Sequence, residues 1–245
     1  MKRYFRAWLM CQSMFCAIPS PQLWDEEAKD KMLLFLPVIG LEMGIIWVGL
    51  AWACRWLVLP APLTALLLST YPYLVSGFLH LDGYMDVTDA IRSWRDLQRR
   101  REILKDSHVG SFAVIGFGLL LLAQFACFLA VPAQTESWIL LGIPAASRCC
   151  SALAVMGLKP MSTSQYAGRR VSKPQMLTVA MLLGILVFGG FLLCGRYGIC
   201  LLACVAGYGA ALRKGYRALE GMNGDISGYA LTIGELCAVA AYALV

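Results

Sequence analysis

Long apolar segments separated by short polar stretches dominate this sequence. A helix of about 17 to 25 apolar residues crosses the hydrocarbon core of a membrane. The segments that reach or approach this length are 32–56, 62–79, 112–131, 138–158, 176–194, 197–212 and 228–245. A further apolar run at 7–18 is shorter. We therefore predict seven transmembrane helices, preceded by an N-terminal helix that lies in the membrane interface or re-enters the membrane.

The composition indicates an integral membrane protein. Of the 245 residues, 59% are hydrophobic and 15% are charged, whereas soluble domains carry about 25% charged residues. The apolar segments are unbroken, unlike the alternating strands of a transmembrane barrel. Helices are then the remaining way to satisfy backbone hydrogen bonds in lipid. The predicted fold is an all-α, polytopic helical bundle that forms one domain over residues 1–245.

The distribution of Lys and Arg predicts the orientation in the membrane. With a cytoplasmic N-terminus, the loops 80–111, 159–175 and 213–227 face the cytoplasm. They contain Arg92, Arg95, Arg99, Arg100, Arg101, Lys105, Lys159, Arg169, Arg170, Lys173, Arg213, Lys214 and Arg217. The opposite loops contain only Arg196. Because cytoplasmic loops are enriched in Lys and Arg, we predict the N-terminus inside and the C-terminus outside.

Three other features of the composition have simple interpretations. The ten cysteines lie mostly in apolar segments and form no CxxC pair, so we expect reduced packing residues. The net charge of +6 fits attraction to lipid headgroups, and no pattern of a nucleic-acid-binding module accompanies it. The basic, apolar N-terminus has no A-x-A cleavage site, so we expect it to be retained.

A cluster of acids follows the second predicted span. At 100° per residue, Asp82, Asp86 and Asp89 lie within about 60° of one another on a helix. Mg²⁺ binds one or two carboxylates together with substrate phosphates, so these residues are candidate metal ligands. A solvated helix face is the alternative, but the acids begin directly at the end of an apolar span. His80 is either a base or an interfacial polar residue.

Two further polar stretches are candidate phosphate sites. The basic run from Arg95 to Lys105 offers bidentate Arg donors and a Lys point charge, although such runs are also found on solvated juxtamembrane helices. The segment 220–228 surrounds Asp225 with three glycines, which suits close approach of the backbone to a ligand or an ordinary turn. Inside the spans, Glu42, Arg148 and Glu235 are either functional or paired with one another.

These residues resemble the cobalamin (5′-phosphate) synthases, also called adenosylcobinamide-GDP ribazoletransferases. The motifs of that family read roughly H-L-D-G-x-x-D-x-x-D-G and G-R-D-x-x-R-R-x-E-I-M-K-D-S-R-V-G-S-F-G. This chain matches them at His80, Leu81, Asp82, Gly83, Asp86, Asp89, Arg95, Asp96, Arg99, Arg100, Glu102, Ile103, Lys105, Asp106, Ser107, Val109, Gly110, Ser111 and Phe112. Further similarity lies at 36–40, at Ser147-Arg148 and at Gly224-Asp225-x2-Gly228. Glycines of the pattern are replaced by Ala90, Ser93 and Trp94.

The resemblance implies a reaction in which adenosylcobinamide-GDP and α-ribazole, or its 5′-phosphate, give adenosylcobalamin, or its 5′-phosphate, and GMP. It implies that Asp82 and Asp86 hold Mg²⁺ and that Asp89 is a third ligand or the general base. It implies that Arg95, Arg99 and Lys105 hold the diphosphate and that Asp225 completes the site. Further candidates for catalysis or substrate binding are His80, Arg100, Asp106, Ser107, Arg148 and Gly224.

The resemblance also implies a cytoplasmic membrane of a bacterium or archaeon, with the active site facing the cytoplasm. A second copy of the chain and other corrinoid-pathway enzymes are candidate partners. Two alternatives come from other classes. A CDP-alcohol phosphotransferase also uses spaced Asp residues, but its D-G-x2-A-R element is absent after Asp82-Gly83. A small transporter could use Glu42, Arg148 and Glu235 as a relay, but no internal repeat supports it.

Overall fold

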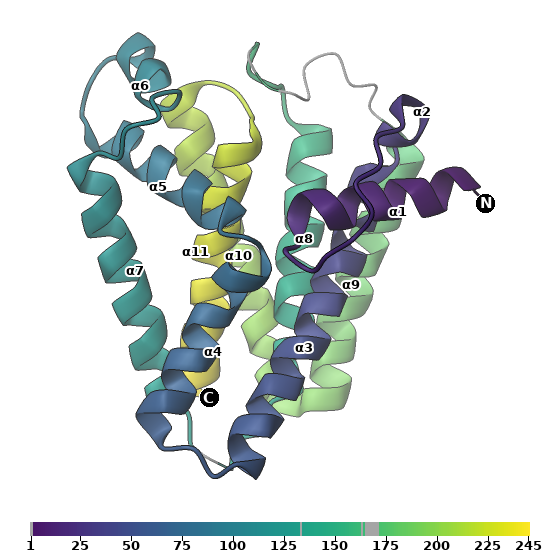
Figure 1. Cartoon of the computed structure of the whole chain (residues 1–245), viewed down its shortest axis with the longest axis vertical. Coiled ribbons are helices and arrows are strands. Elements are labelled where there is room, and N and C mark those ends of the chain that lie inside the picture. The colour runs from purple at the N-terminus through teal and green to yellow at the C-terminus, as the bar shows by residue number, and fades with distance from the viewer. Residues whose placement is uncertain (1, 133, 163, 165–171) are drawn as a thin grey trace.

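Helices account for nearly all of the ordered secondary structure. The computed structural model describes residues 2–132, 134–162, 164 and 172–245, and these form helices and connecting loops without a β-strand (Figure 1). The α-helices are α1 (Lys2–Phe15), α2 (Glu26–Lys29), α3 (Leu36–Trp56), α4 (Ala61–Val75), α5 (Leu79–Arg92), α6 (Leu97–Ile103), α7 (Ser111–Ala130), α8 (Ile139–Gly157), α9 (Lys173–Cys194), α10 (Ile199–Leu219) and α11 (Gly224–Leu244). Two 3₁₀ turns, η1 (Met32–Phe35) and η2 (Gly195–Gly198), join them.

Each of the seven predicted spans falls on a helix. Five helical stretches are long and apolar enough to cross a membrane, and a sixth is added if α4 and α5 count as one bent span. One of the five, Lys173–Leu219, contains both α9 and α10. The chain reverses between them at η2, where Gly195 has a positive φ of 57° and Gly198 packs against the backbone of Phe191. The prediction of an all-α membrane bundle is therefore confirmed.

The core is built on α8, which is buried on nearly all sides, and on α11 beside it. Helix α3 lies against α8 at Gly40 and Gly44, where an added methyl group would collide with the backbone of Pro144 and Leu141. By contrast, α9 buries only Val179, as expected for a helix whose surroundings are lipid. All ten cysteines are unpaired and most are buried, which confirms their interpretation as packing residues.

The predicted span 62–79 is wrong at its C-terminal end. Helix α4 stops at Val75, and α5 begins at Leu79 with its axis turned by 90°. Gly77 and Phe78 both have a positive φ, 59° and 63°, a left-handed conformation that breaks the helix. The apolar composition continues through this bend, so composition did not reveal it. As a result, α5 crosses the face of α11 instead of continuing the direction of α4 (Figure 1).

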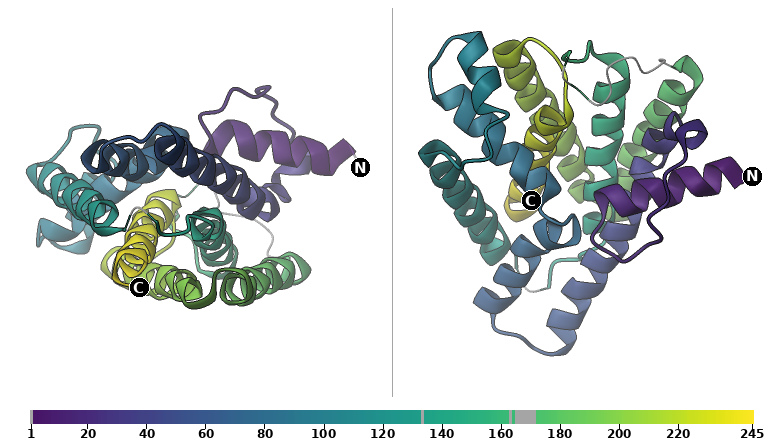
Figure 2. Two further views of the ribbon diagram at one scale, coloured as in Figure 1. Left: turned by 90° about the horizontal axis from the view of Figure 1, so that it is seen from below. Right: turned by 45° about the horizontal axis from the view of Figure 1, so that its top comes forward.

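The loops gather at two opposite ends of the bundle. The C-terminal end of α5, α6 and the α10–α11 loop lie at the upper end, together with the loop that follows α8 (Figure 1; Figure 2). The connections α3–α4 and η2 lie at the lower end. This grouping is the one that the Lys and Arg pattern predicts. Arg169 and Arg170 lie outside the described residues. Which end faces the cytoplasm stays a prediction.

Helix α1 lies across the bundle instead of along it (Figure 1). Its exposed residues include Lys2, Arg3 and Arg6, and its buried face includes Met10 and Phe15. It is not among the helices long and apolar enough to span. This arrangement fits the prediction of an interfacial helix at 7–18, although the helix ends at Phe15 and begins earlier.

Candidate functional site

The acidic motif of α5 lies directly against the first turn of α11. A methyl group added to Gly83 would lie 2.9 Å from the Cα atom of Asp225, and one added to Gly228 would lie 3.1 Å from the carbonyl oxygen of His80. The two helices therefore touch backbone to backbone at both glycines. The sequence places Asp82 and Asp225 143 residues apart, and the fold brings them to one surface.

Asn223 fixes the start of α11. Its side-chain oxygen accepts a hydrogen bond of 3.0 Å from the backbone N–H of Ile226, and its amide nitrogen donates one of 2.6 Å to the carboxylate of Asp225. The first bond is an N-cap, which satisfies a free N–H of the first turn. The second holds the Asp225 side chain. The predicted loop therefore begins a helix, and Gly224 and Asp225 are its first two residues.

Four carboxylates surround this contact. Asp82 is exposed, and Asp86, Asp89 and Asp225 are half-buried. The carboxylates of Asp82, Asp89 and Asp225 are near enough to that of Asp86 to repel it electrostatically. Within the described part of the chain, no ion pair neutralises any of the four. A concentration of negative charge without a protein cation is a favourable environment for a divalent metal ion.

The predicted metal ligands are not gathered into a complete coordination site. Among the described residues, no group of three or more His, Cys, Asp or Glu side chains is arranged to hold a metal ion. The carboxylate of Asp89 instead lies over Gly110, at the start of α7, where a methyl group would collide with it. Oxygen ligands from two carboxylates still suit Mg²⁺, which completes its shell with water and substrate phosphates.

The basic run is divided between structural and free side chains. Arg101 donates hydrogen bonds of 2.9 and 3.0 Å to the carbonyl oxygen of Leu219 and one of 3.0 Å to that of Glu220. Arg100 donates to the carbonyl oxygen of Ala218 at 3.3 Å. These carbonyls are at the C-terminus of α10, where cations stabilise a helix. Arg100 thus connects α6 to α10 through one of its guanidinium nitrogens, and its role in phosphate binding stays a prediction.

The other predicted phosphate ligands are exposed. Arg95 and Lys105 extend from either end of α6, and Arg99 forms an ion pair of 2.8 Å with Glu102. In the following loop, Ser107 is exposed. Hydrogen bonds from the Nδ1 ring atom and the backbone N–H of His108 hold the pKa of Asp106 below its usual range. Asp106 therefore organises the loop between α6 and α7.

The charged groups within the spans are paired. Arg148 of α8 is 1% exposed and forms an ion pair with Glu235 of α11, and Ser147 donates to the same carboxylate at 2.8 Å. Glu42 accepts a hydrogen bond of 3.0 Å from the indole of Trp8. The structure thus places Arg148 in a buried pair between α8 and α11. The pairing of Arg148 with an acid is therefore confirmed, whereas Glu42 bonds a neutral indole.

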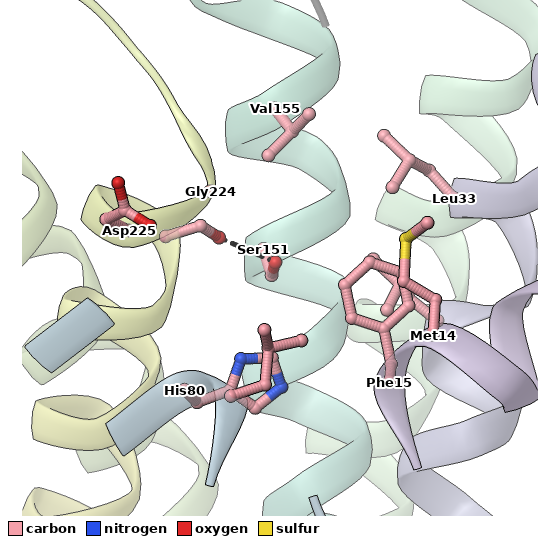
Figure 3. A pocket seen from close by; sticks show the side chains of 11 residues that line it. Met14, Phe15, Leu33, His80, Ser151, Val155, Gly224 and Asp225 are labelled. Atoms are coloured by element: carbon pink, nitrogen blue, oxygen red, sulfur yellow. Dashed lines mark hydrogen bonds between the residues drawn. The ribbon is translucent and has the colours of Figure 1, made fainter. Parts of the chain in front are cut away.

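Sequence reasoning missed a cavity beside the acids. It lies between α1, α5, α8 and α11, has a volume of about 190 Å³, and is lined by residues that include Phe15, His80, Ser151, Ser227 and Asp225 (Figure 3). His80, a candidate base, is buried in its wall. Ser151, a polar residue within the apolar segment of α8, was the one sequence feature that indicated a cavity. Nothing in the sequence indicates that α1 contacts α5.

The profile of the cobalamin-5-phosphate synthase family matches residues 7–243. The chain belongs to this family. Curated relatives named adenosylcobinamide-GDP ribazoletransferase include one from Clostridium perfringens (strain 13 / Type A), which is 36% identical over 98% of both chains. Another, from Clostridium botulinum (strain Alaska E43 / Type E3), is 33% identical over 96% of both. A third, from Geotalea daltonii, is 30% identical over 94% of both. No solved structure matches the chain.

The region that matches the cobalamin-5-phosphate synthase family contains nearly every element described above. The matched region includes α5, α6, α8 and α11, and therefore both sides of the contact between the acidic motif and Asp225. It also includes most of α1, whose Phe15 lines the cavity. The site and the cavity are thus parts of the family domain.

Proposed function

We propose that this chain is an adenosylcobinamide-GDP ribazoletransferase of the cytoplasmic membrane. It would transfer the phosphocobinamide group of adenosylcobinamide-GDP to α-ribazole or α-ribazole 5′-phosphate. A ribose hydroxyl oxygen forms a bond to the phosphorus attached to cobinamide, the bond from that phosphorus to the oxygen of GMP breaks, and the hydroxyl proton passes to a base. The observation that carries this proposal is the contact of the acidic helix α5 with Asp225, in a chain of this family.

The chemistry needs positioning and charge neutralisation more than a covalent intermediate. Asp82 and Asp86 would hold Mg²⁺, with Asp225 facing them from α11. The ion, when bound, neutralises negative charge that develops on the diphosphate. Asp89, held over Gly110, is the remaining carboxylate and would be a further ligand or accept the hydroxyl proton. Arg95, Arg99 and Lys105 would bind the outer phosphate oxygens, because they lie exposed at the same end of the bundle.

The activity is tested by release of GMP. The protein in liposomes, supplied with Mg²⁺ and both substrates, should release one GMP for each corrinoid product, and EDTA should stop the release. Asp82→Asn and Asp86→Asn should each reduce kcat at least 100-fold, since each removes a metal ligand charge. Glu136→Gln is the matched control, because Glu136 is exposed in the loop between α7 and α8, which lies at the lower end of the bundle (Figure 1). Full activity of Asp82→Asn, or in EDTA, would contradict the metal assignment.

The orientation is tested separately. Lys105→Cys and Glu136→Cys place a thiol at the two ends of the bundle. In intact cells, a membrane-impermeant maleimide should label the Glu136→Cys protein and should label the Lys105→Cys protein only after the cells are opened. The unmodified chain gives the background from its own cysteines. The reverse labelling pattern would place the acidic site outside the cell.

A further inference from the structure

The cavity beside Asp225 has both apolar walls and a small number of polar groups. Its apolar lining residues are Met14, Phe15, Leu33, Leu36, Leu79 and Val155. Ser151, Ser227, His80 and Asp225 provide the polar atoms. Figure 3 shows these side chains arranged around a central space, with Phe15 and Leu33 opposite Asp225. Such a combination is typical of a site for a small organic ligand.

Most of the polar groups in this wall already have partners. Ser151 and Ser227 hydrogen-bond to one another at 2.7 Å, and the hydroxyl of Tyr208 lies 3.1 Å from that of Ser227. His80 is different. It is 8% exposed, and its Nε2 atom has no hydrogen-bond partner among the described residues. An unpaired buried polar atom is destabilising, so a ligand that pairs with Nε2 recovers a stabilising interaction.

The size of the cavity suits a small ring. The rings of Phe15 and His80 are nearly parallel, with an interplanar angle of 15° and centroids 6.3 Å apart, so they stack on one another and together give the cavity one aromatic side. The cavity volume of about 190 Å³ is somewhat larger than a cavity of about 150 Å³ that binds benzene. It therefore accommodates one ring system of about two fused rings and not a whole nucleotide or corrinoid.

We propose that this cavity binds the heteroaromatic base of the acceptor nucleoside, with the Nε2 atom of His80 pairing with a ring nitrogen. The inference rests on the proposed function and adds to it a subsite for the acceptor. Asp225 forms part of the cavity wall and of the contact with the acidic helix. A base in the cavity therefore directs its attached ribose toward the carboxylates. His80 is then a positioning residue for the acceptor and not a group that takes the hydroxyl proton.

The proposal is tested by direct binding of benzimidazole. Equilibrium dialysis of the full chain in liposomes should show saturable binding of radiolabelled benzimidazole to the unmodified protein. Val155→Phe fills the cavity and should weaken this binding at least tenfold. His80→Phe keeps a ring in place but removes Nε2, and should also weaken it at least tenfold. Phe5→Leu is the control, since Phe5 is on α1 but is exposed and outside this cavity, and should bind as the unmodified protein does.

The GMP assay then separates this proposal from the proposed function. The KM for α-ribazole should rise at least tenfold in Val155→Phe and in His80→Phe, while the KM for adenosylcobinamide-GDP stays within twofold. Circular dichroism and thermal melting identify any variant that fails to fold, and His80→Gln then provides a second test of Nε2. A rescue of binding by Gln supports the pairing.

Two outcomes would overturn the cavity proposal while the proposed function stands. One is GMP release without saturable benzimidazole binding by the unmodified protein. The other is a KM for α-ribazole that is unchanged in both variants. If the unmodified protein binds benzimidazole and the variants lose it, but no GMP is released, the cavity proposal survives as a binding site and the proposed function fails.

Discussion

The backbone of Gly83 in α5 rests on the backbone of Asp225 in α11. A methyl group at Gly83 would come within 2.9 Å of both the Cα atom and the carbonyl oxygen of Asp225, closer than Cβ atoms approach their neighbours in folded proteins. Glycine at this position therefore sets the separation of the two acidic elements. The site depends on the absence of a side chain as much as on its carboxylates.

We expect Gly83→Ala to force α5 away from α11. Overpacking of this kind costs about 1–3 kcal/mol of stability, and a displacement of about 1 Å at a reacting centre can reduce the rate about 100-fold. GMP release should therefore fall more than thermal stability does. Gly118→Ala is the matched control, because Gly118 lies in a helix with nothing within 4 Å of an added methyl group. Equal activity of the two variants would show that the close approach is not needed.

Arg101 holds the loop that leads to Asp225. Its guanidinium bonds the carbonyl oxygens of Leu219 and Glu220, and hydrogen bonds from a charged group contribute about 1.5–3 kcal/mol. Arg101→Gln should lower the melting temperature and reduce kcat at least tenfold, with a smaller change in KM. Arg213→Gln removes the same charge from an exposed position on α10 and should leave both unchanged. A loss of activity in Arg213→Gln of similar size would indicate a general charge effect instead.

The pair Arg148–Glu235 should behave as a structural connection between α8 and α11. Removing one partner leaves the other charge buried and unpaired, which costs about 3–5 kcal/mol. Glu235→Leu and Arg148→Met should each lower the melting temperature strongly. The double variant should recover most of the loss, because no unpaired charge remains. If it recovers stability but GMP release stays abolished, Arg148 has a direct role with substrate after all.

Trp94 occupies a backbone conformation that favours glycine. Its φ is 54° and its side chain is 88% exposed, and the family pattern has glycine in this segment. A left-handed conformation costs an ordinary residue about 1–2 kcal/mol, so Trp94→Gly should raise the melting temperature of the purified protein. Ser93→Gly is the control, because its neighbour Ser93 has a negative φ of −65°. A lower melting temperature for Trp94→Gly would show that the indole contributes a stabilising contact with lipid.

The sequence was sufficient to predict the helices but not several of the contacts between them. Apolar length predicts each membrane helix, because backbone hydrogen bonding leaves little choice in lipid. The face shared by Asp82 and Asp86 follows from helical spacing. The 90° bend could not be predicted, because it rests on the φ angles of Gly77 and Phe78 within a run that remains apolar. Composition does not encode such a local conformation.

Contacts between segments far apart in the sequence could not be predicted from it either. Phe15 and His80 share a cavity wall although 65 residues separate them, and no pattern in either segment refers to the other. Arg100 illustrates the opposite problem. Its charge and position suit a phosphate, but the carbonyl oxygen of Ala218 lies within hydrogen-bonding distance. Residue type predicted the chemistry available to each side chain, and only the fold determined its partner.

The bend after α4 also determines how deep the site lies. With 15 residues and a rise of 1.5 Å each, α4 is about 22 Å long, whereas the hydrocarbon core is about 30 Å thick. Any tilt of α4 shortens its reach further. We therefore expect the beginning of α5, with His80, to lie below the level of the headgroups, and substrates dissolved in water to enter the polar end of the bundle to reach the carboxylates.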